Sequence, residues 1–182
     1  GGEKPGILPS PEWKKKAFRR PQDQVWFPGE TVNFGVGQGY LTVTPVQLAH
    51  ATAMLAMRGR SFRPRLVTGV RDAVSGAVKA LPAAPLPGID DVDSTNWDRV
   101  IRGMEGATRY GTAAAIGKGA AYTLAGKTGT AQVFSIGQQE RYNDAANAAR
   151  QRNERLRDHS WFVAFAPVES PRIAICVLVE NG

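Results

Sequence analysis

Lysine, threonine and glycine gather in one short segment, residues 126–130, between two stretches of strand-forming residues. Glycine weakens a strand unless a ligand or another backbone must come close, so the two glycines predict an edge kept clear for a ligand. Strand alternation places Thr128 and Thr130 on one face, where hydroxyls and backbone N–H groups offer donors to a carbonyl or an anion. Lys127 adds a positive charge. The alternative is a Gly- and Thr-rich loop with a solvated lysine.

A phosphate-binding loop, G-x-x-x-x-G-K-[ST], would also end at residues 126–128. The first glycine of that motif would have to stand at residue 121, which is alanine. The residues after Thr128 predict a strand, and so the helix N-terminus that would hold the phosphates is missing. We therefore disfavour a nucleotide site.

The composition is typical of a globular chain. Its 182 residues are enough for one domain with a sizeable core, and 42% hydrophobic with 21% charged residues argue against disorder. The longest apolar run, residues 173–179, is too short to span a bilayer. The net charge is +7, but the basic residues form separate groups with no nucleic-acid-binding motif beside them. We expect surface solvation or attraction to an anionic polymer or membrane surface, and no nucleic acid; a basic nucleic-acid-binding domain is the alternative.

Capping signals predict the helices that must position this segment. A serine or threonine followed by proline begins a helix over residues 11–20 and another that runs from residue 45 to the glycine at 59. A third helix, over residues 94–110, carries an apolar stripe on one face. A long polar excursion, residues 135–159, is expected to be a surface insertion with a helix over 144–157.

The strands of the predicted core are apolar on both faces. Residues 161–166 and 173–179 must be covered on both sides, and the short connection between them makes the two strands antiparallel. Residues 65–81 predict a hairpin, and residues 31–36 a short strand or extended segment. With the lysine-containing strand, these elements predict an α/β (α+β) fold, an antiparallel sheet with helices on both faces.

Other residues that can do chemistry have simpler structural interpretations. His50 lies on a core helix, and a metal site shared with His159 is disfavoured because these are the two histidines of the chain. Asp158 beside His159 marks a junction between loop and strand. Cys176 lies in an apolar strand as a small hydrophobe. Residues 94–96 spell S-x-N, but they begin an amphipathic helix and are interpreted as its cap.

The lysine segment resembles the K-T-G box of serine acyltransferases that react with penicillin, and its surroundings resemble class B penicillin-binding proteins. The segments that carry this resemblance are residues 37–39 with 44–47, 111–113, 125–132 and 161–167. Residues 11–16 and the insertion from 142 to 159 look like the elongation-specific, rod-shape branch of that family. The resemblance covers nearly all of the chain and implies the fold shared by penicillin-binding transpeptidases and serine β-lactamases.

The resemblance implies a peptidoglycan D,D-transpeptidase that works through a serine acyl-enzyme without a metal or cofactor. Lys127 would be catalytic by holding positive potential at the site. Thr128 and Thr130 would bind the terminal carboxylate of the substrate, and Gly129 would let the ligand backbone lie against the strand. The backbone N–H of Thr130 would be an oxyanion donor. The implied partners are D-Ala-D-Ala stem peptides, β-lactams and membrane-embedded cell-wall elongation proteins, at the periplasmic face of the inner membrane.

One element of the family pattern is missing. None of the seven serines is followed by a lysine three positions later, so the S-x-x-K nucleophile is absent. We expect residues 1–182 to be the C-terminal part of one transpeptidase domain, inactive by itself, with the nucleophile and the membrane anchor outside this chain. A non-catalytic penicillin-recognition or sensor module of the same fold is the alternative hypothesis.

Overall fold

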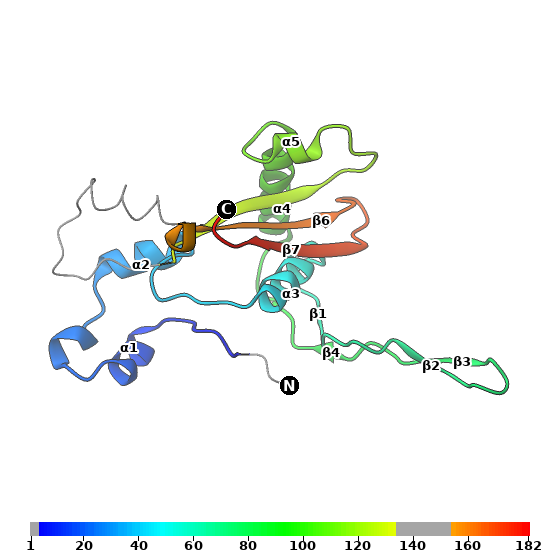
Figure 1. Ribbon diagram of the computed structural model, residues 1–182, viewed down its shortest axis with the longest axis horizontal. Helices are drawn as coiled ribbons and strands as arrows, with labels where there is room; N and C mark the ends of the chain where they lie inside the picture. Colours follow the sequence, from blue (N-terminus) through cyan, green and yellow to red (C-terminus); the bar gives the residue numbers. More distant parts are fainter. Residues whose placement is uncertain (1–3, 134–153) are drawn as a thin grey trace.

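A three-stranded antiparallel sheet in the order β5-β6-β7 forms the centre of the molecule (Figure 1). The computed structural model describes residues 4–133 and 154–182. The strands are β5 (Ala125–Ala131), β6 (His159–Ala166) and β7 (Ile173–Val179). Their register pairs Lys127 with Val163, and Val163 with Cys176. The predicted lysine-containing strand and the antiparallel pair that follows it are therefore confirmed.

Two long helices pack on this sheet; the first begins at the predicted threonine cap, and the second is capped by Asp93, the residue before the 94–96 segment interpreted as its cap. Helix α3 (Pro45–Ala56) starts with a capping box in which the Thr44 hydroxyl accepts from the N–H of Gln47, and the Gln47 side chain accepts from the N–H of Thr44. Helix α4 (Ser94–Arg109) is capped by the carboxylate of Asp93, which accepts from the N–H of Thr95 at 2.7 Å. These bonds satisfy N–H groups that a helix start leaves open.

The main hydrophobic cluster lies on one face of the sheet, among the described residues. Ala56 of α3 and Ile101 of α4 pack with Ala125 and Phe165, which the strand register places opposite each other on one face. The predicted mixed fold, an antiparallel sheet with helices packed on it, is confirmed. On the second face, side chains of β7 are 37% to 60% exposed: Ile173, Ile175, Val177 and Val179.

The N-terminal segment folds into short helices: α1 (Pro11–Ala17), the 3-10 helix η1 (Pro21–Gln24) and α2 (Pro28–Gly35). The strand or extended segment predicted over residues 31–36 is wrong. The Glu30 carboxylate, at the third position of α2, accepts from the N–H of Phe27 at 2.8 Å and supports the helix start. Helix α1 ends earlier than predicted because Phe18 leaves the helix and packs its ring against Tyr40.

A buried lysine holds this N-terminal segment together. Lys14 is 1% exposed, and its ammonium pairs with Glu30 and donates to the carbonyl of Val25 at 2.7 Å. Three aromatic rings lie 5.3–5.9 Å from the Lys14 nitrogen: Phe18, Phe27 and Tyr40. Burial by itself would raise the pKa of the Glu30 carboxyl, but the hydrogen bonds from Lys14 and from the Phe27 N–H hold that pKa below its ordinary value.

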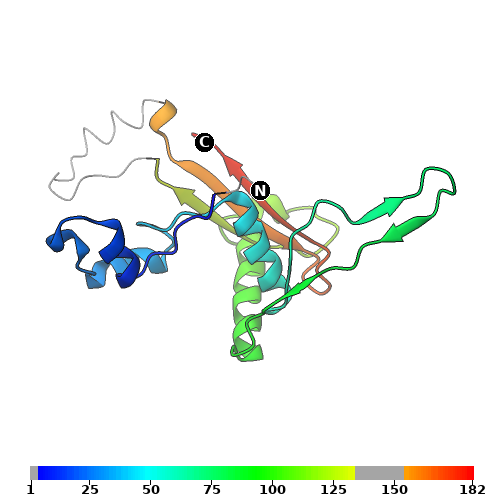
Figure 2. The same ribbon diagram turned by 90° about the horizontal axis from the view of Figure 1, so that it is seen from below.

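A thin two-stranded arm leaves the body between α3 and α4 (Figures 1 and 2). At its base β1 (Ser61–Phe62) pairs with β4 (Pro85–Leu86), and further out β2 (Gly69–Arg71) pairs with β3 (Val78–Ala80). The predicted hairpin is confirmed. Figure 2 shows the arm on the opposite side of the molecule from α1 and α2.

The predicted insertion at 135–159 falls largely outside the described residues, and so does most of its predicted helix. Its described end contains the 3-10 helix η2 (Glu154–Leu156), and β6 already begins at His159. A short helix, α5 (Ala114–Gly117), follows α4 and precedes β5. Within residues 4–133 and 154–182, none of the helices has the length and apolar character needed to cross a membrane.

Candidate functional site

Strand β5 is an outer strand of the described sheet and presents Lys127 and the two threonines. Alternation alone would send Lys127 to the face opposite Thr128, but the ammonium of Lys127 donates to the backbone carbonyl of Thr128 at 2.8 Å. The long lysine side chain therefore folds back along the strand and holds its charge beside the threonine. No ion pair involves Lys127 in the described part of the chain, so its positive charge is not neutralised there.

The two glycines of β5 have different roles. A Cβ at Gly126 would lie 2.6 Å from the ring of Phe162, so glycine is required there for packing. A Cβ at Gly129 would meet only the Cβ of Trp161 at 3.4 Å, which is ordinary contact. The prediction that both glycines keep an edge clear for a ligand is therefore wrong for Gly126. At Gly129 the described residues leave room for a side chain, and the ligand role stays a prediction.

A residue outside the predicted site contacts it. The hydroxyl of Thr112, in the turn between α4 and α5, lies 3.2 Å from the hydroxyl of Thr128. Thr112 belongs to the segment 111–113 that carries the family resemblance, and this resemblance is the one sign in the sequence that Thr112 belongs near the site. Residue types and spacing gave it no role, because the two threonines meet only through the packing of α4 on β5.

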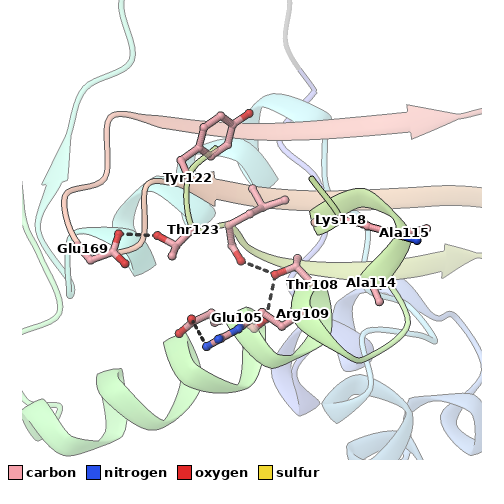
Figure 3. A pocket seen from close by; sticks show the side chains of 11 residues that line it. Glu105, Thr108, Arg109, Ala114, Ala115, Lys118, Tyr122, Thr123 and Glu169 are labelled. Carbon is pink, nitrogen blue, oxygen red and sulfur yellow. Dashed lines mark hydrogen bonds and ion pairs between the residues drawn. The ribbon is translucent and has the colours of Figure 1, made fainter. Parts of the chain in front are cut away.

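The C-terminal end of α4 is tied to the start of β5. Thr108 is 2% exposed, and its hydroxyl donates to the carbonyls of Glu105 and Leu124, as Figure 3 shows for Thr108. The bond to Leu124 joins the last turn of the helix to the residue before the strand. A hollow of about 690 Å³ opens beside this contact, lined in part by Arg109, Lys118 and Glu169 (Figure 3).

A second pocket lies at the other end of β5. It has a volume of about 430 Å³ and is lined by Thr130 and Ala131 of the strand, by Trp161, and by the loop at residues 37–43. Thr130 thus belongs both to the lysine segment and to this pocket. The indole nitrogen of Trp161 is buried and has no hydrogen-bond partner among the described residues.

The other candidate side chains have structural partners. His50 contacts the hydroxyl of Ser61 at 3.2 Å, and the ring of His159 accepts from the N–H of Asn181 at 3.1 Å. Burial raises the pKa of the Cys176 thiol, which is half-buried on the covered face of the sheet. Ser94 is the first residue of α4, next to the Asp93 cap. Among the described residues no cluster of three or more acidic, histidine or cysteine side chains is arranged to hold a metal ion.

Comparison with known proteins gives the same assignment for sequence and fold. The family described as the penicillin binding protein transpeptidase domain matches residues 2–182. The chain is 40% identical to the peptidoglycan D,D-transpeptidase MrdA of Acinetobacter baumannii, over 99% of this chain and 25% of that protein. The chain therefore spans about a quarter of the length of this relative.

Solved structures of penicillin-binding proteins support the same family assignment. The crystal structure of Pseudomonas aeruginosa PBP2 in complex with WCK 5153 superposes with a TM-score of 0.69 at 39% identity, covering 100% of this chain and 34% of that one. The complex between penicillin-binding protein PBP2 and MreC from Helicobacter pylori gives 0.70 at 28% identity, covering 100% and 28%. The strand with its lysine and threonines, the helices behind it and these matches together show that the chain belongs to the transpeptidase domain family of penicillin-binding proteins, with relatives of the PBP2 type.

Proposed function

We propose that this chain forms one wall of the active site of a peptidoglycan D,D-transpeptidase. In the proposed reaction, a serine supplied from outside these 182 residues attacks the carbonyl between the two terminal D-alanines of a stem peptide, and the last D-alanine leaves. An amine of a neighbouring strand then attacks the acyl-enzyme, forms the cross-link and frees the serine. β-Lactams would acylate the same serine.

The observation that supports this proposal most directly is the placement of Lys127 on β5. Its ammonium lies beside Thr128, unpaired among the described residues, on a strand with an open edge. A positive charge at that place lowers the free energy of negative charge that develops on the serine and on the carbonyl oxygen during acylation. Thr128 and Thr130 would hold the terminal carboxylate, and Gly129, which has no side chain, would let the ligand lie along the strand.

Partners and location follow from the same assignment. The substrate would be the D-Ala-D-Ala stem peptide, and the H. pylori relative solved with MreC supports an assembly with cell-wall elongation proteins. Such a protein works at the periplasmic face of the inner membrane. The positive net charge of +7 suits a peptidoglycan substrate that carries carboxylates.

Substitution of Lys127 in the full-length protein tests the proposal. We expect Lys127→Ala to lower the rate of acylation by a fluorescent penicillin by about 100-fold or more, the usual size of a lost electrostatic contact at a transition state. Lys79→Ala removes the same charge from an exposed residue of β3 in the arm and should leave the rate unchanged. Unchanged acylation in Lys127→Ala would rule out its catalytic role.

A second measurement separates an enzyme from a sensor module. The full-length protein should release D-alanine from a stem peptide in the presence of an amine acceptor. Acylation by penicillin without any release of D-alanine would favour the non-catalytic recognition module.

A further inference from the structure

Two hydroxyl groups from different parts of the fold meet at the lysine strand. Thr112 Oγ1 and Thr128 Oγ1 are 3.2 Å apart, and neither hydroxyl has another partner among the described residues. Thr112 is exposed and Thr128 half-buried. Two hydroxyls hold two protons, and their mutual bond uses one of them. The pair therefore keeps a free donor, and it can offer both protons to an acceptor that replaces the mutual bond.

The turn that carries Thr112 is fixed on both sides. The N–H of Gly111 donates to the carbonyl of Gly106 at 3.0 Å, and the N–H of Ala113 donates to that of Ala107 at 2.9 Å. A Cβ at Gly111 would lie 2.8 Å from the Cα of Ala107, so the turn needs glycine at this position. Ala113 is 2% exposed. Thr112 thus projects from an anchored turn, which reduces the entropy lost when it binds a ligand.

The strand that carries Thr128 is fixed to the same helix. The buried hydroxyl of Thr108 bonds to the carbonyl of Leu124, one residue before β5, so helix and strand are joined within four residues of each threonine (Figure 3). The distance between the two hydroxyls is therefore set by the fold. The ammonium of Lys127, bonded to the Thr128 carbonyl at 2.8 Å, supplies positive charge beside the pair.

We propose that Thr112 is a third carboxylate-binding residue of the site, which acts as a pair with Thr128. This inference rests on the proposed function and adds a residue to it. Two neighbouring O–H donors suit the two oxygens of a carboxylate, and a nearby ammonium favours an anion over a neutral carbonyl. The ligand group is the terminal carboxylate of a stem peptide or the equivalent carboxylate of a β-lactam.

The test compares a charged and a neutral ligand on the full-length protein. Acylation rate constants are measured with benzylpenicillin, which has the free carboxylate, and with its methyl ester, which lacks the charge. For Thr112→Val, which keeps the side-chain shape without the hydroxyl, we expect a loss of about tenfold or more with the acid and little change with the ester. Thr112→Ser, which restores a hydroxyl, should recover most of the rate with the acid.

The ratio of the two rate constants is measured within one preparation, so partial misfolding of a variant does not alter it. An equal loss with acid and ester, or no loss with either, would overturn the role of Thr112 and leave the proposed function intact. Acylation of the unsubstituted protein by neither probe would overturn the proposed function and this inference with it. The same comparison can be made on D-alanine release, with a stem peptide that has a free C-terminal carboxylate and with its C-terminal amide. This assay distinguishes substrate binding from antibiotic binding. A loss of rate in Thr112→Val with the carboxylate peptide alone supports the proposal for the substrate.

Discussion

The two outer strands of the sheet meet solvent with opposite chemistry. Strand β5 exposes Lys127, Gly129 and Thr130, leaves Thr128 half-buried and buries the small Ala125 and Gly126. Strand β7 exposes aliphatic side chains along its second face, among them Ile173 at 60% and Val179 at 51%. The polar edge has the donors that a ligand needs, whereas the aliphatic face has none.

This difference indicates which exposed surface of the described sheet is stable in water and which one requires a covering partner. The polar groups of β5 keep their contact with water, and the buried residues of the strand lie at its start, near the end of α4. The aliphatic face of β7 is a contiguous apolar surface of the kind that proteins cover. We interpret β5 as an edge built to stay open and β7 as a strand whose second face requires a cover.

The core of the covered face should respond most strongly to truncation. Phe165 is 1% exposed and packs with Ala56, Ile101 and Ala125, so we expect Phe165→Ala to lower the free energy of unfolding by about 3–5 kcal/mol. Val177→Ala on the open face should cost under about 1 kcal/mol, because that side chain is 45% exposed. Denaturant unfolding of this chain measures both. Similar losses would show that the two faces are equally buried in solution.

The two glycines of β5 give the next largest contrast. Gly126→Ala places a Cβ 2.6 Å from the Phe162 ring and should lower the free energy of unfolding by about 1–3 kcal/mol. Gly129→Ala should leave stability nearly unchanged but slow acylation in the full-length protein, because a methyl group there would crowd the ligand backbone that is proposed to lie against the strand. Thermal unfolding and penicillin uptake are measured for both variants. A loss of stability in Gly129→Ala but not in Gly126→Ala would show that Gly129, and not Gly126, is the glycine required for packing.

The two faces of β7 should also differ in thiol chemistry, by a smaller factor. Burial raises the pKa of the Cys176 thiol, so its thiolate forms only at a higher pH than that of an ordinary exposed cysteine, about 8.5. We expect alkylation of Cys176 by iodoacetamide to begin at higher pH and to be several-fold slower than alkylation of the thiol introduced by Val177→Cys in a Cys176→Ser background. Equal pH profiles would show that the covered face is open to solvent.

Features set by neighbouring residues could be predicted from the sequence. The capping box at Thr44 and Gln47 and the antiparallel pairing of β6 with β7 depend on a few adjacent positions or on the length of one connection. Helix α2 is a local feature that the sequence-based prediction misses, since it covers most of residues 31–36, for which a short strand or extended segment is expected. The proline at residue 28 and the glutamate at residue 30 were the missed signals of a helix start.

Features set by packing could not be predicted. The contact of Thr112 with Thr128 joins residues 16 positions apart and depends on how α4 lies on β5. The roles of Gly126 and Gly129 differ because one faces the Phe162 ring, which depends on the register of β6. The open face of β7 has the residue pattern of a buried strand, and composition does not tell which part of a chain covers it.

The burial of Lys14 has a practical consequence. Amine-reactive reagents need an unprotonated, accessible nitrogen, and this ammonium is enclosed by Glu30 and aromatic rings while Lys15 and Lys16 next to it are exposed. In a labelling time course read by mass spectrometry, the neighbours should be modified first and Lys14 last. The labelling of a single side chain would then report when the N-terminal segment opens, without any change to the sequence.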